Sequence, residues 1–319
     1  MRTRRSRFSG NQVPSTPEVK PPEQKHLPVL LHEVLSGLAI RENDVVVDAT
    51  LGGAGHALAM AKQLGESGVL VGFDEDHDAI ERARVALSGV DAKTILVKGN
   101  FRDIAKHLPE RGIQRIDKAL FDLGWSSYQL AVGRGFSLMR DEPLLMTFAT
   151  HPAENSLTAA KIVNEWEESS IADVLYGWGE ERYSRRIAKG IVERRAIKPL
   201  TTTSELVETI VHSVPASYRH GKIHPATRTF QALRIAVNDE LGSLTKALAD
   251  AWRLLAPSGR IAVISFHSLE DRIVKQTFRQ WHSAGEGLNL TKKPIIAGPE
   301  ELRTNPRAHS AKLRIIEKI

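Results

Sequence analysis

The 319-residue sequence predicts an α/β fold in which a doubly wound, mostly parallel sheet carries an inserted α-helical domain. Short runs rich in Val, Ile and Leu alternate with segments of helical periodicity, as in parallel strands that are covered on both faces. Acidic residues end three of these runs, and a glycine-rich turn follows the first. Between residues 138 and 212 the strand pattern gives way to helical segments rich in Glu and Arg.

Five buried strands and three helices can be placed from apolar runs and periodicity. The strands are expected at residues 44–48, 69–73, 94–97, 117–121 and 260–266. The helices are expected at residues 57–64, 78–87 and 247–255. Pro257-Ser258-Gly259 is expected to turn the chain before the fifth strand. Two short strands, at residues 292–296 and 311–316, are expected to pair antiparallel at the sheet edge.

Composition divides the chain into four expected parts. They are a disordered basic tail (1–25), a first part of the α/β domain (26–137), the helical insertion (138–212) and a second part of the α/β domain (213–319). The tail holds six basic and two acidic residues, four prolines and few apolar ones, so it is expected to stay unfolded. An organellar targeting segment and a loose RNA-contacting arm are alternatives, although residues 1–9 lack the apolar stripe of a presequence.

Composition also excludes several kinds of site. The chain has no cysteine, which removes disulfides, thiolate catalysis and cysteine-ligated metals. It has no apolar run of about 18 residues, so no membrane span is expected and a cytoplasmic location fits. No cluster of His and carboxylates has the spacing of metal ligands, so no metal site is expected. The net charge of +6 lies mostly in the tail and is weak support for a nucleic-acid partner.

Candidate ligand residues follow four successive strands. Because ligands of such sheets bind at the carboxyl ends of the strands, these residues are expected to share one crevice. Glycines let the backbone approach a ligand closely, and an acid after the second strand can accept hydrogen bonds from both ribose hydroxyls. The residues are Asp48 and the turn at 52–55, then Asp74, then Asn100 and Phe101, and lastly Asp122. This order predicts a nucleoside cofactor.

Other interpretations of these residues are weaker. A dinucleotide site needs glycines in the spacing G-x-G-x-x-G, but counting from Gly53 the third position is Leu58, which disfavours a dehydrogenase. Taken singly, the glycine turn could be a tight connection and Asp74 a helix cap. Their joint order favours a mononucleoside ligand without a pyrophosphate.

Longer motifs carry a resemblance that covers residues 26–319. With DLGWSS at residues 122–127 as the first match, the chain resembles the bacterial small-subunit ribosomal RNA cytosine-N4 methyltransferases, the RsmH (formerly MraW) family. The other matching stretches are HEVL (32–35), RGFS (134–137), YGWGEER (176–182), HPATRTFQAL (224–233), SFHSLEDR (265–272) and NPRA (305–308).

The resemblance implies a class I methyltransferase fold and methyl transfer from S-adenosylmethionine to N4 of a cytidine in the decoding region of small-subunit rRNA. The implied partner is that RNA or the 30S subunit. Without the family, His56 would be taken as an exposed residue at a helix start. By position, the family's cofactor contacts fall on Ala54, Gly55, His56, Asp74, Phe101, Asp122 and Gln129.

The chain departs from the family pattern after RGFS. The family usually has Pro-Leu-Asp-Met-Arg-Met, whereas residues 143–148 read PLLMTF and lack both the acid and the arginine. The lost pair bears on the target-base pocket rather than on the cofactor positions, and it leaves a catalytically silent RNA-binding protein as an alternative. The other departures are Trp125 for a small aliphatic residue, Tyr128 for proline and His309 for arginine.

Asp122 is the candidate catalytic residue. The N4 lone pair of cytosine is delocalised into the ring, so an acceptor bonded to N4–H is needed to hold that lone pair toward the methyl group, and much of the rate comes from positioning. Asp122 supplies such a carboxylate, and Trp125 supplies a ring on which the base could stack. The alternatives are an Asp122 that only contacts the cofactor and a Trp125 that packs under the loop.

Basic side chains are candidates for RNA binding. Residues 182–198 hold seven basic residues and one acidic residue, and this density suits phosphates. One helical face is expected to carry Arg182, Arg185, Arg186 and Lys189. The competing interpretation is a solvated helix face.

A second RNA-facing helix is expected at residues 226–241. Its buried stripe is expected to be Phe230, Leu233, Val237 and Leu241, and its nucleotide-facing side Arg228, Gln231, Arg234 and Asn238. Partners for nearby carboxylates are the alternative role of that side. His267 is a further candidate to touch the target nucleotide, next to a capping pair expected at Ser268 and Asp271.

Overall fold

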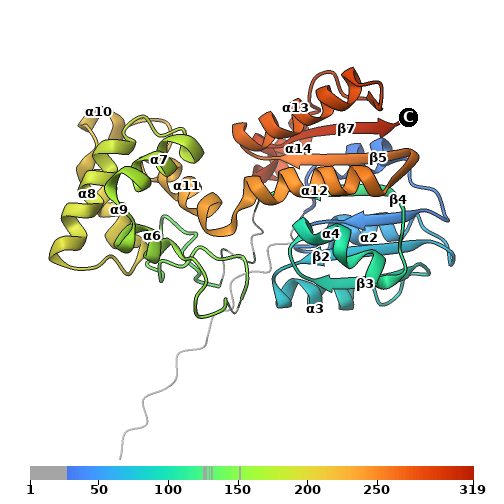
Figure 1. Cartoon of the computed structure of the whole chain (residues 1–319), viewed down its shortest axis with the longest axis horizontal. Helices are drawn as coiled ribbons and strands as arrows, with labels where there is room; N and C mark the ends of the chain where they lie inside the picture. Colours follow the sequence, from blue (N-terminus) through green and yellow to red (C-terminus); the bar gives the residue numbers. More distant parts are fainter. Residues whose placement is uncertain (1–26, 125–127, 129, 131, 151) are drawn as a thin grey trace, which may run out of the picture.

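A computed structural model describes residues 27–319 with the exception of 125–127, 129, 131 and 151. The predicted basic tail, Trp125 and Gln129 therefore lie outside the described residues. The chain forms two lobes (Figure 1). One, the α/β lobe, holds the sheet and its helices, and the other, the helical lobe, holds α6 to α11.

The α/β lobe is built on a seven-stranded sheet in the order β3-β2-β1-β4-β5-β7-β6. Strands β1 to β5 are parallel, and β7 runs antiparallel to both β5 and β6. This confirms the predicted doubly wound, mostly parallel sheet. The strands are β1 (Val45–Asp48), β2 (Val69–Asp74), β3 (Lys93–Lys98), β4 (Ile116–Asp122), β5 (Leu255–Ser265), β6 (Gly287–Asn289) and β7 (Lys312–Lys318).

Helices cover both faces of the sheet, and each face has its own hydrophobic core. Alternate side chains of a strand point to opposite faces, so Val46 packs in one core and Val47 in the other. The helices on the first face are α1 (Leu31–Leu38), α2 (Gly55–Ala61) and α3 (His77–Ala86). Those on the second face are α4 (Ile104–His107), α12 (Glu240–Leu254) and α13 (Ser268–Ser283). Two shorter helices near the C-terminus are α14 (Pro299–Thr304) and η3 (Pro306–Ser310).

The helical lobe has a third hydrophobic core of its own. Its members run from Leu144 to Ala236, beyond residue 212, where the insertion was expected to end. The close packing of α7 on α11 depends on Gly179, where an added Cβ would lie 2.5 Å from the carbonyl oxygen of Arg228. The helices are α6 (Ala159–Glu165), α7 (Glu168–Gly179), α8 (Ser184–Ile197), α9 (Thr203–Ser213), α10 (Ala216–Arg219) and α11 (Thr227–Asn238).

Three predicted elements differ in the structure. The helix expected at 226–241 ends at Asn238, because Asp239 takes a left-handed conformation (φ 46°) and α12 starts at Glu240. Leu241 therefore belongs to α12 rather than to the buried stripe of α11. At the C-terminus β7 pairs with β5 and the short β6, and residues 292–296 contribute only one isolated bridge, from Ile295. The predicted turn at Pro257-Ser258-Gly259 lies inside β5, where the register with β4 shifts.

Among the described residues, no helix is both long enough and apolar enough to cross a membrane.

Candidate active site

A cavity opens at the carboxyl ends of the first four parallel strands, and the loops after these strands supply most of its lining. The loop after β1 contributes Gly52 and Gly53, and the start of α2 contributes Gly55 and His56. Asp74, the last residue of β2, lines the cavity together with Glu75 and Asp76. Asn100 and Phe101 follow β3, and Asp122, the last residue of β4, is followed by Leu123 and Gly124. The residues at the ends of four successive strands thus line one cavity, as expected for a sheet of this topology.

The carboxylate of Asp74 is held at the cavity wall by two backbone amides. Oδ2 accepts a hydrogen bond from the amide of Gly52 (2.9 Å), and Oδ1 accepts one from the amide of Asp76 (2.9 Å). Gly52 has a φ of 49°, a conformation that glycine adopts without strain. Burial raises the pKa of Asp74 to about 6, against the opposing effect of these two amides. A ligand hydroxyl that donates to this carboxylate would replace part of the lost hydration.

Phe101 forms the side of the cavity next to Asp74. It begins a short 3-10 helix (Phe101–Asp103), which is capped by Asn100 through a bond from the amide of Arg102 to Oδ1. The Phe101 ring packs edge-to-face on Phe121 of β4, with 5.8 Å between the ring centroids. Because Phe121 is fully buried, the Phe101 ring is fixed in the cavity wall, where a purine could stack on it.

Asp122 and His56 meet in the wall of the cavity. The Nδ1 atom of His56 lies 3.4 Å from Oδ2 of Asp122, and its Nε2 atom lies 2.9 Å from the carbonyl oxygen of Val29. Burial lowers the pKa of His56, but the hydrogen bond and charge of Asp122 and the charge of Asp48 outweigh it, so the pKa is raised overall. The other carboxylate oxygen of Asp122, Oδ1, is buried and has no hydrogen-bond partner among the described residues.

The charge of the cavity favours a cationic ligand. Six acidic side chains and one arginine, Arg307, line it. Asp76, Glu240 and Glu270 are paired with Arg134, Arg234 and His267. The remaining acids would repel a pyrophosphate, whereas a sulfonium beside an unpartnered carboxylate oxygen would be stabilised. The acidic side chains are Asp74, Glu75, Asp76, Asp122, Glu240 and Glu270. The donor set therefore fits S-adenosylmethionine better than a dinucleotide.

Two residues that were expected at the ligand do not line the cavity. Asp48 is fully buried behind it, with Oδ1 bonded to the amide of Thr50. Burial raises the pKa of Asp48 to about 6, although the charge of His56 opposes the rise. Ala54 is the N-cap of α2 with a φ of 61°, and it is also buried. Of the other expected cofactor contacts, Gly55, His56, Asp74, Phe101 and Asp122 line the cavity.

A second cavity adjoins the first and shares Leu123, Gly124 and Arg307 with it. Apolar side chains from the helical lobe and from the segment before it form one wall: Phe136, Leu138, Met146 and Phe230. Gln231, Arg234 and His267 add polar groups. A cavity with apolar walls and a few polar groups suits a planar polar ring such as a nucleobase.

Two ion pairs stand where the cavities meet. Arg234 binds Glu240 through two hydrogen bonds of 2.8 and 3.0 Å, and Nε2 of His267 lies 3.2 Å from Oε1 of Glu270. Glu240, His267 and Glu270 each offer one atom of a kind that can bind a metal ion, and these atoms lie within 4.8 Å of one another. The spacing of the residues in the sequence does not reveal this cluster, because Glu240 begins α12 whereas His267 and Glu270 lie at the start of α13. Burial raises the pKa of Glu240 against the opposing effect of Arg234.

The capping pair of α13 is not the one expected. The amide of Glu270 donates to Nδ1 of His267, and Oε2 of Glu270 accepts from the amide of His267, so these two residues form the capping box. Ser268 instead donates to Glu180 of the helical lobe (2.7 Å), and Asp271 pairs with Arg314 of β7 (2.7 Å). His267 was expected near the target nucleotide and does line the second cavity.

The expected RNA-binding residues lie in three different environments. Arg185 and Arg186 are exposed on α8, whereas Arg182 precedes that helix and stacks on the rings of Tyr183 and Tyr218. Gln231 and Arg234 line the second cavity. Arg228 donates to the carbonyl oxygen of Glu180 and lines neither cavity.

The stretch that departs from the family pattern joins both cavities. Phe148 lines the first cavity and Met146 lines the second. Their backbone is held by Asn238, which accepts from the Phe148 amide and donates to the Met146 carbonyl oxygen, and by Arg134, which donates to the Phe148 carbonyl oxygen. Backbone hydrogen bonds therefore fix this stretch without the acid and arginine that the family usually has.

Comparison with known proteins points to one family. The curated ribosomal RNA small subunit methyltransferase H of Heliobacterium modesticaldum is 47% identical over 311 residues, which cover 92% of this chain and 98% of that protein. The protein of the same name from Brevibacillus brevis is 45% identical over 310 residues, with the same coverage. The one from Clostridioides difficile is 42% identical over 313 residues, covering 93% of this chain and all of that protein. The profile of a methylase family matches residues 23–319, which include every strand of the sheet and both cavities, and the chain therefore belongs to the MraW methylase family.

Proposed function

We propose that this protein transfers a methyl group from S-adenosylmethionine to the exocyclic N4 of a cytidine in the decoding region of small-subunit ribosomal RNA. The named relatives are small-subunit rRNA methyltransferases, which supports the reaction and the substrate class. Their substrate also leads us to propose the 30S subunit as partner and the cytoplasm as location. One observation carries the proposal: Asp122 lines the acidic cavity, and the two residues after it line both cavities.

The first cavity is proposed to hold the cofactor. Asp74 would accept hydrogen bonds from the ribose hydroxyls, and the Phe101 ring would pack against the adenine. Gly52 and Gly55 let the backbone come close to the ligand because they carry no side chain. When bound, S-adenosylmethionine supplies an electrophilic methyl group, and Asp122 stands at the end of the cavity nearest to the second one.

The second cavity is proposed to hold the target base. Phe136 and Phe230 offer apolar surface to the faces of a pyrimidine. Gln231 donates from Nε2 to the carbonyl oxygen of Trp178, so its amide oxygen is the polar atom it offers to the edge of the base, beside His267. A base inside structured RNA must leave its stack to enter such a cavity, at a cost of a few kcal/mol. The shared residues Leu123 and Gly124 would then bring N4 to the mouth of the cofactor cavity.

Asp122 is proposed to orient the amine. Its buried Oδ1 has no partner among the described residues, so it can accept a hydrogen bond from N4–H and recover part of its desolvation penalty. That bond would turn the N4 lone pair toward the first cavity. Rate enhancement by positioning of this kind needs no strong base.

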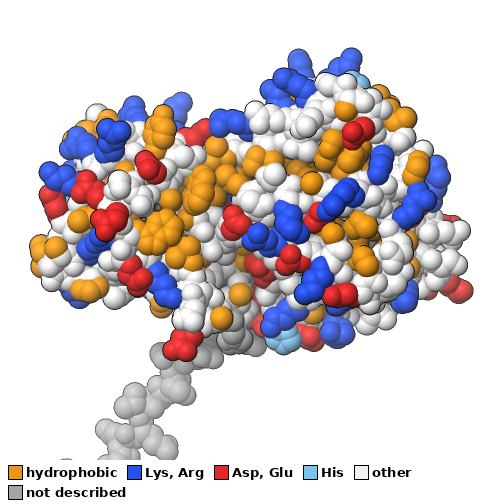
Figure 2. Space-filling model, in the orientation of Figure 1, with side chains coloured by type: hydrophobic (Ala, Val, Ile, Leu, Met, Phe, Trp, Pro, Cys, Tyr) orange, Lys and Arg blue, Asp and Glu red, His pale blue; other side chains and the backbone are white. Residues whose placement is uncertain are grey.

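The helical lobe is proposed to dock the RNA. Arg185 and Arg186 lie exposed on α8 and can contact phosphates. In the face drawn in Figure 2, Lys and Arg side chains are spread over both lobes among acidic ones, so the docking surface would be made of several small contacts. Residues 138–212 remain the proposed insertion, and α11 packs with it.

The proposal is tested on 30S subunits from cells that lack this protein. Incubation with the purified protein and labelled S-adenosylmethionine should place label in 16S-type RNA, and nucleoside mass spectrometry should find N4-methylated cytidine. The Asp122→Asn variant should bind S-adenosylmethionine and transfer the methyl group far more slowly. Label on another nucleoside, or no label at all, would refute the proposed function, and unchanged turnover of Asp122→Asn would refute the role of Asp122.

A further inference from the structure

The environment of His56 allows only one of its two ring nitrogens to change protonation. Nε2 lies 2.9 Å from the carbonyl oxygen of Val29, which can only accept a hydrogen bond, so Nε2 carries a proton. Nδ1 faces the Asp122 carboxylate at 3.4 Å. The His56 side chain is 6% exposed, so solvent offers little alternative for either nitrogen.

The segment that holds His56 in this orientation is itself fixed by the C-terminal region. Val29 belongs to a segment that is bonded to the C-terminal region: the Leu30 amide donates to Glu301, and Asn305 donates to the Leu27 carbonyl oxygen. The same segment packs closely on α2, since a Cβ added at Gly55 would lie 3.1 Å from the Pro28 ring. The carbonyl oxygen of Val29 therefore gives Nε2 a fixed partner, which leaves Nδ1 facing Asp122.

One proton fits between His56 and Asp122. Two lone pairs would face each other across the 3.4 Å gap if neither group held a proton, whereas a proton on either group makes a hydrogen bond. The charged groups around the pair are Asp48 from β1, which faces His56 and Asp122, and Arg307 from η3, which faces Asp122. Asp74 from β2 acts on Asp48. The acids favour a protonated pair and Arg307 opposes it.

We propose that His56 and Asp122 act together as the acceptor of the proton that N4 loses during methylation. This inference rests on the proposed function. In the step, the sulfur–methyl bond breaks, the N4–methyl bond forms, and one N4–H bond breaks. The Asp122 carboxylate takes up this proton at Oδ1. Rotation of the carboxyl group about its Cβ–Cγ bond turns that oxygen toward His56, and the proton ends on Nδ1, so an anionic pair of carboxylate and imidazole becomes a neutral pair of carboxylate and imidazolium.

Charge balance favours this assignment. The methyl group leaves a cation and makes N4 cationic until a proton departs, so one positive charge moves from the first cavity toward the base. A pair that is anionic before the step and neutral after it keeps the buried charge of the site low throughout, which matters where the effective dielectric constant is low. The pair thus removes the proton over a hydrogen-bond distance instead of through bulk water.

The experiment is a pH profile of single-turnover methyl transfer at saturating S-adenosylmethionine. In the unmodified protein the rate should rise with pH through the ionisation of the pair and then level off. His56→Gln can still donate to Val29 but has no titrating nitrogen at Asp122. It should lower the plateau about 10- to 100-fold and move the acid limb to lower pH by about one unit or more. His107→Gln, on a ring that packs against Phe73 outside both cavities, is the matched control and should keep rate and profile.

A second measurement needs no variant and no RNA. In protein labelled with ¹⁵N-histidine, Nε2 of His56 should stay protonated at every pH, and Nδ1 should titrate and lose its proton more readily when S-adenosylmethionine binds. An unchanged profile in His56→Gln, or a His56 ring whose Nδ1 never titrates, would overturn the inference. If the unmodified protein forms no N4-methylcytidine, the proposed function fails instead, and the ¹⁵N titration still reports on the pair.

Discussion

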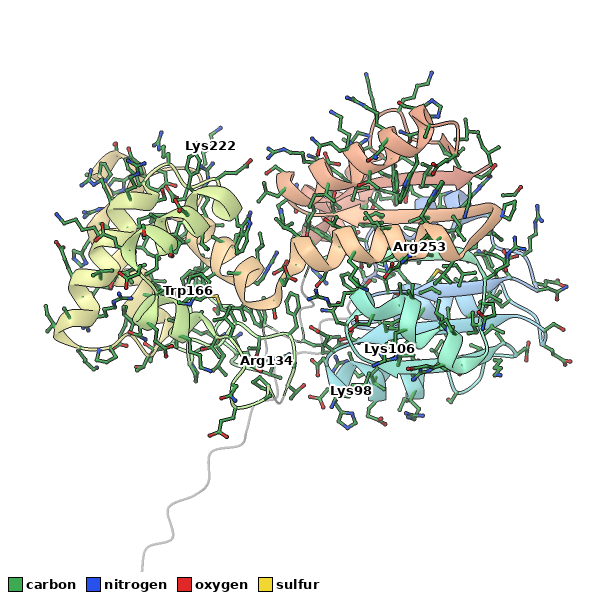
Figure 3. The ribbon with its side chains drawn as sticks, viewed as in Figure 1. Lys98, Lys106, Arg134, Trp166, Lys222 and Arg253 are labelled. Atoms are coloured by element: carbon green, nitrogen blue, oxygen red, sulfur yellow. The ribbon has the colours of Figure 1, made fainter. Side chains whose placement is uncertain are left out.

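Arg134 and Asp76 form a buried ion pair, with 3.0 Å between Nη2 and Oδ2, that ties the segment before the helical lobe to the loop after β2. Figure 3 shows Arg134 in the region between the two lobes. The same guanidinium donates to the carbonyl oxygens of Thr147 and Phe148, so one side chain links the cofactor cavity to the stretch that lines both cavities. The pair therefore couples the geometry of the site to the placement of the helical lobe.

Replacing Arg134 with Ala should destabilise the protein strongly. Both side chains of the pair are at most 7% exposed, and leaving a buried carboxylate unpaired costs about 3–5 kcal/mol. Urea denaturation measures this loss. Arg84→Ala removes an exposed pair with Glu81, and this control should change the free energy of unfolding by less than about 1 kcal/mol. Equal effects of the two substitutions would show that the Arg134 pair is not structural.

Replacing Asp74 with Asn should weaken binding of S-adenosylmethionine. The neutral amide accepts hydrogen bonds more weakly than the carboxylate, and hydrogen bonds to charged groups are worth about 1.5–3 kcal/mol. The dissociation constant should rise about 10- to 100-fold by isothermal titration calorimetry. Asp78→Asn makes the same charge change on the exposed first turn of α3 and should leave the affinity unchanged. Retained affinity in Asp74→Asn would show that the Asp74 carboxylate does not bind the cofactor.

Removing two charges from α8 should flatten the salt dependence of RNA binding. Each phosphate contact contributes about 0.7–0.9 to the slope of log K against log salt concentration. The double substitution Arg185→Gln and Arg186→Gln should therefore lower the slope for small-subunit RNA by up to about 2, measured by fluorescence anisotropy. Arg84→Gln on α3 removes an exposed charge from the α/β lobe as a control. An unchanged slope in the double variant would show that Arg185 and Arg186 do not contact RNA phosphates.

The sheet could be predicted because its determinants are local. The β-branched run at residues 45–47 and the acid that follows it mark a buried strand and its carboxyl end without knowledge of any partner. The same logic located Asp74, Phe101 and Asp122, since in a parallel sheet the carboxyl ends of neighbouring strands must meet. The cofactor cavity follows from topology, and its residues could be named before their distances were known.

The remainder of the site depends on contacts between distant segments. Glu240 reaches Arg234 only because the helix is interrupted at Asp239. No periodic pattern in the sequence distinguishes two helices here from one continuous helix. His56 is oriented by the carbonyl oxygen of Val29, a backbone atom that leaves no mark in the sequence. The capping box of α13 was misplaced by one residue because a histidine, an uncommon cap, occupies the N-cap.

Replacing Asp48 with Asn should change how stability depends on pH. The pKa of Asp48 is raised from 3.8 to about 6 in the folded protein, mainly by burial, so the folded state binds this proton more tightly than the unfolded state does. The contribution of Asp48 to stability is therefore greatest below pH 4, and it declines as the pH rises to about 6 and the buried carboxylate ionises. A shift of this size corresponds to at most about 3 kcal/mol.

Asp48→Asn cannot ionise, so its free energy of unfolding relative to the unmodified protein should increase by up to about 3 kcal/mol between pH 4 and pH 7. Asp74 also has a raised pKa, but it is present in both proteins and cancels in the difference. Urea titrations at several pH values measure the trend, with exposed Asp91→Asn as the control that should give a flat difference. A difference that falls with rising pH would mean that the Asp48 carboxylate is stabilised by its neighbours, with His56 outweighing burial.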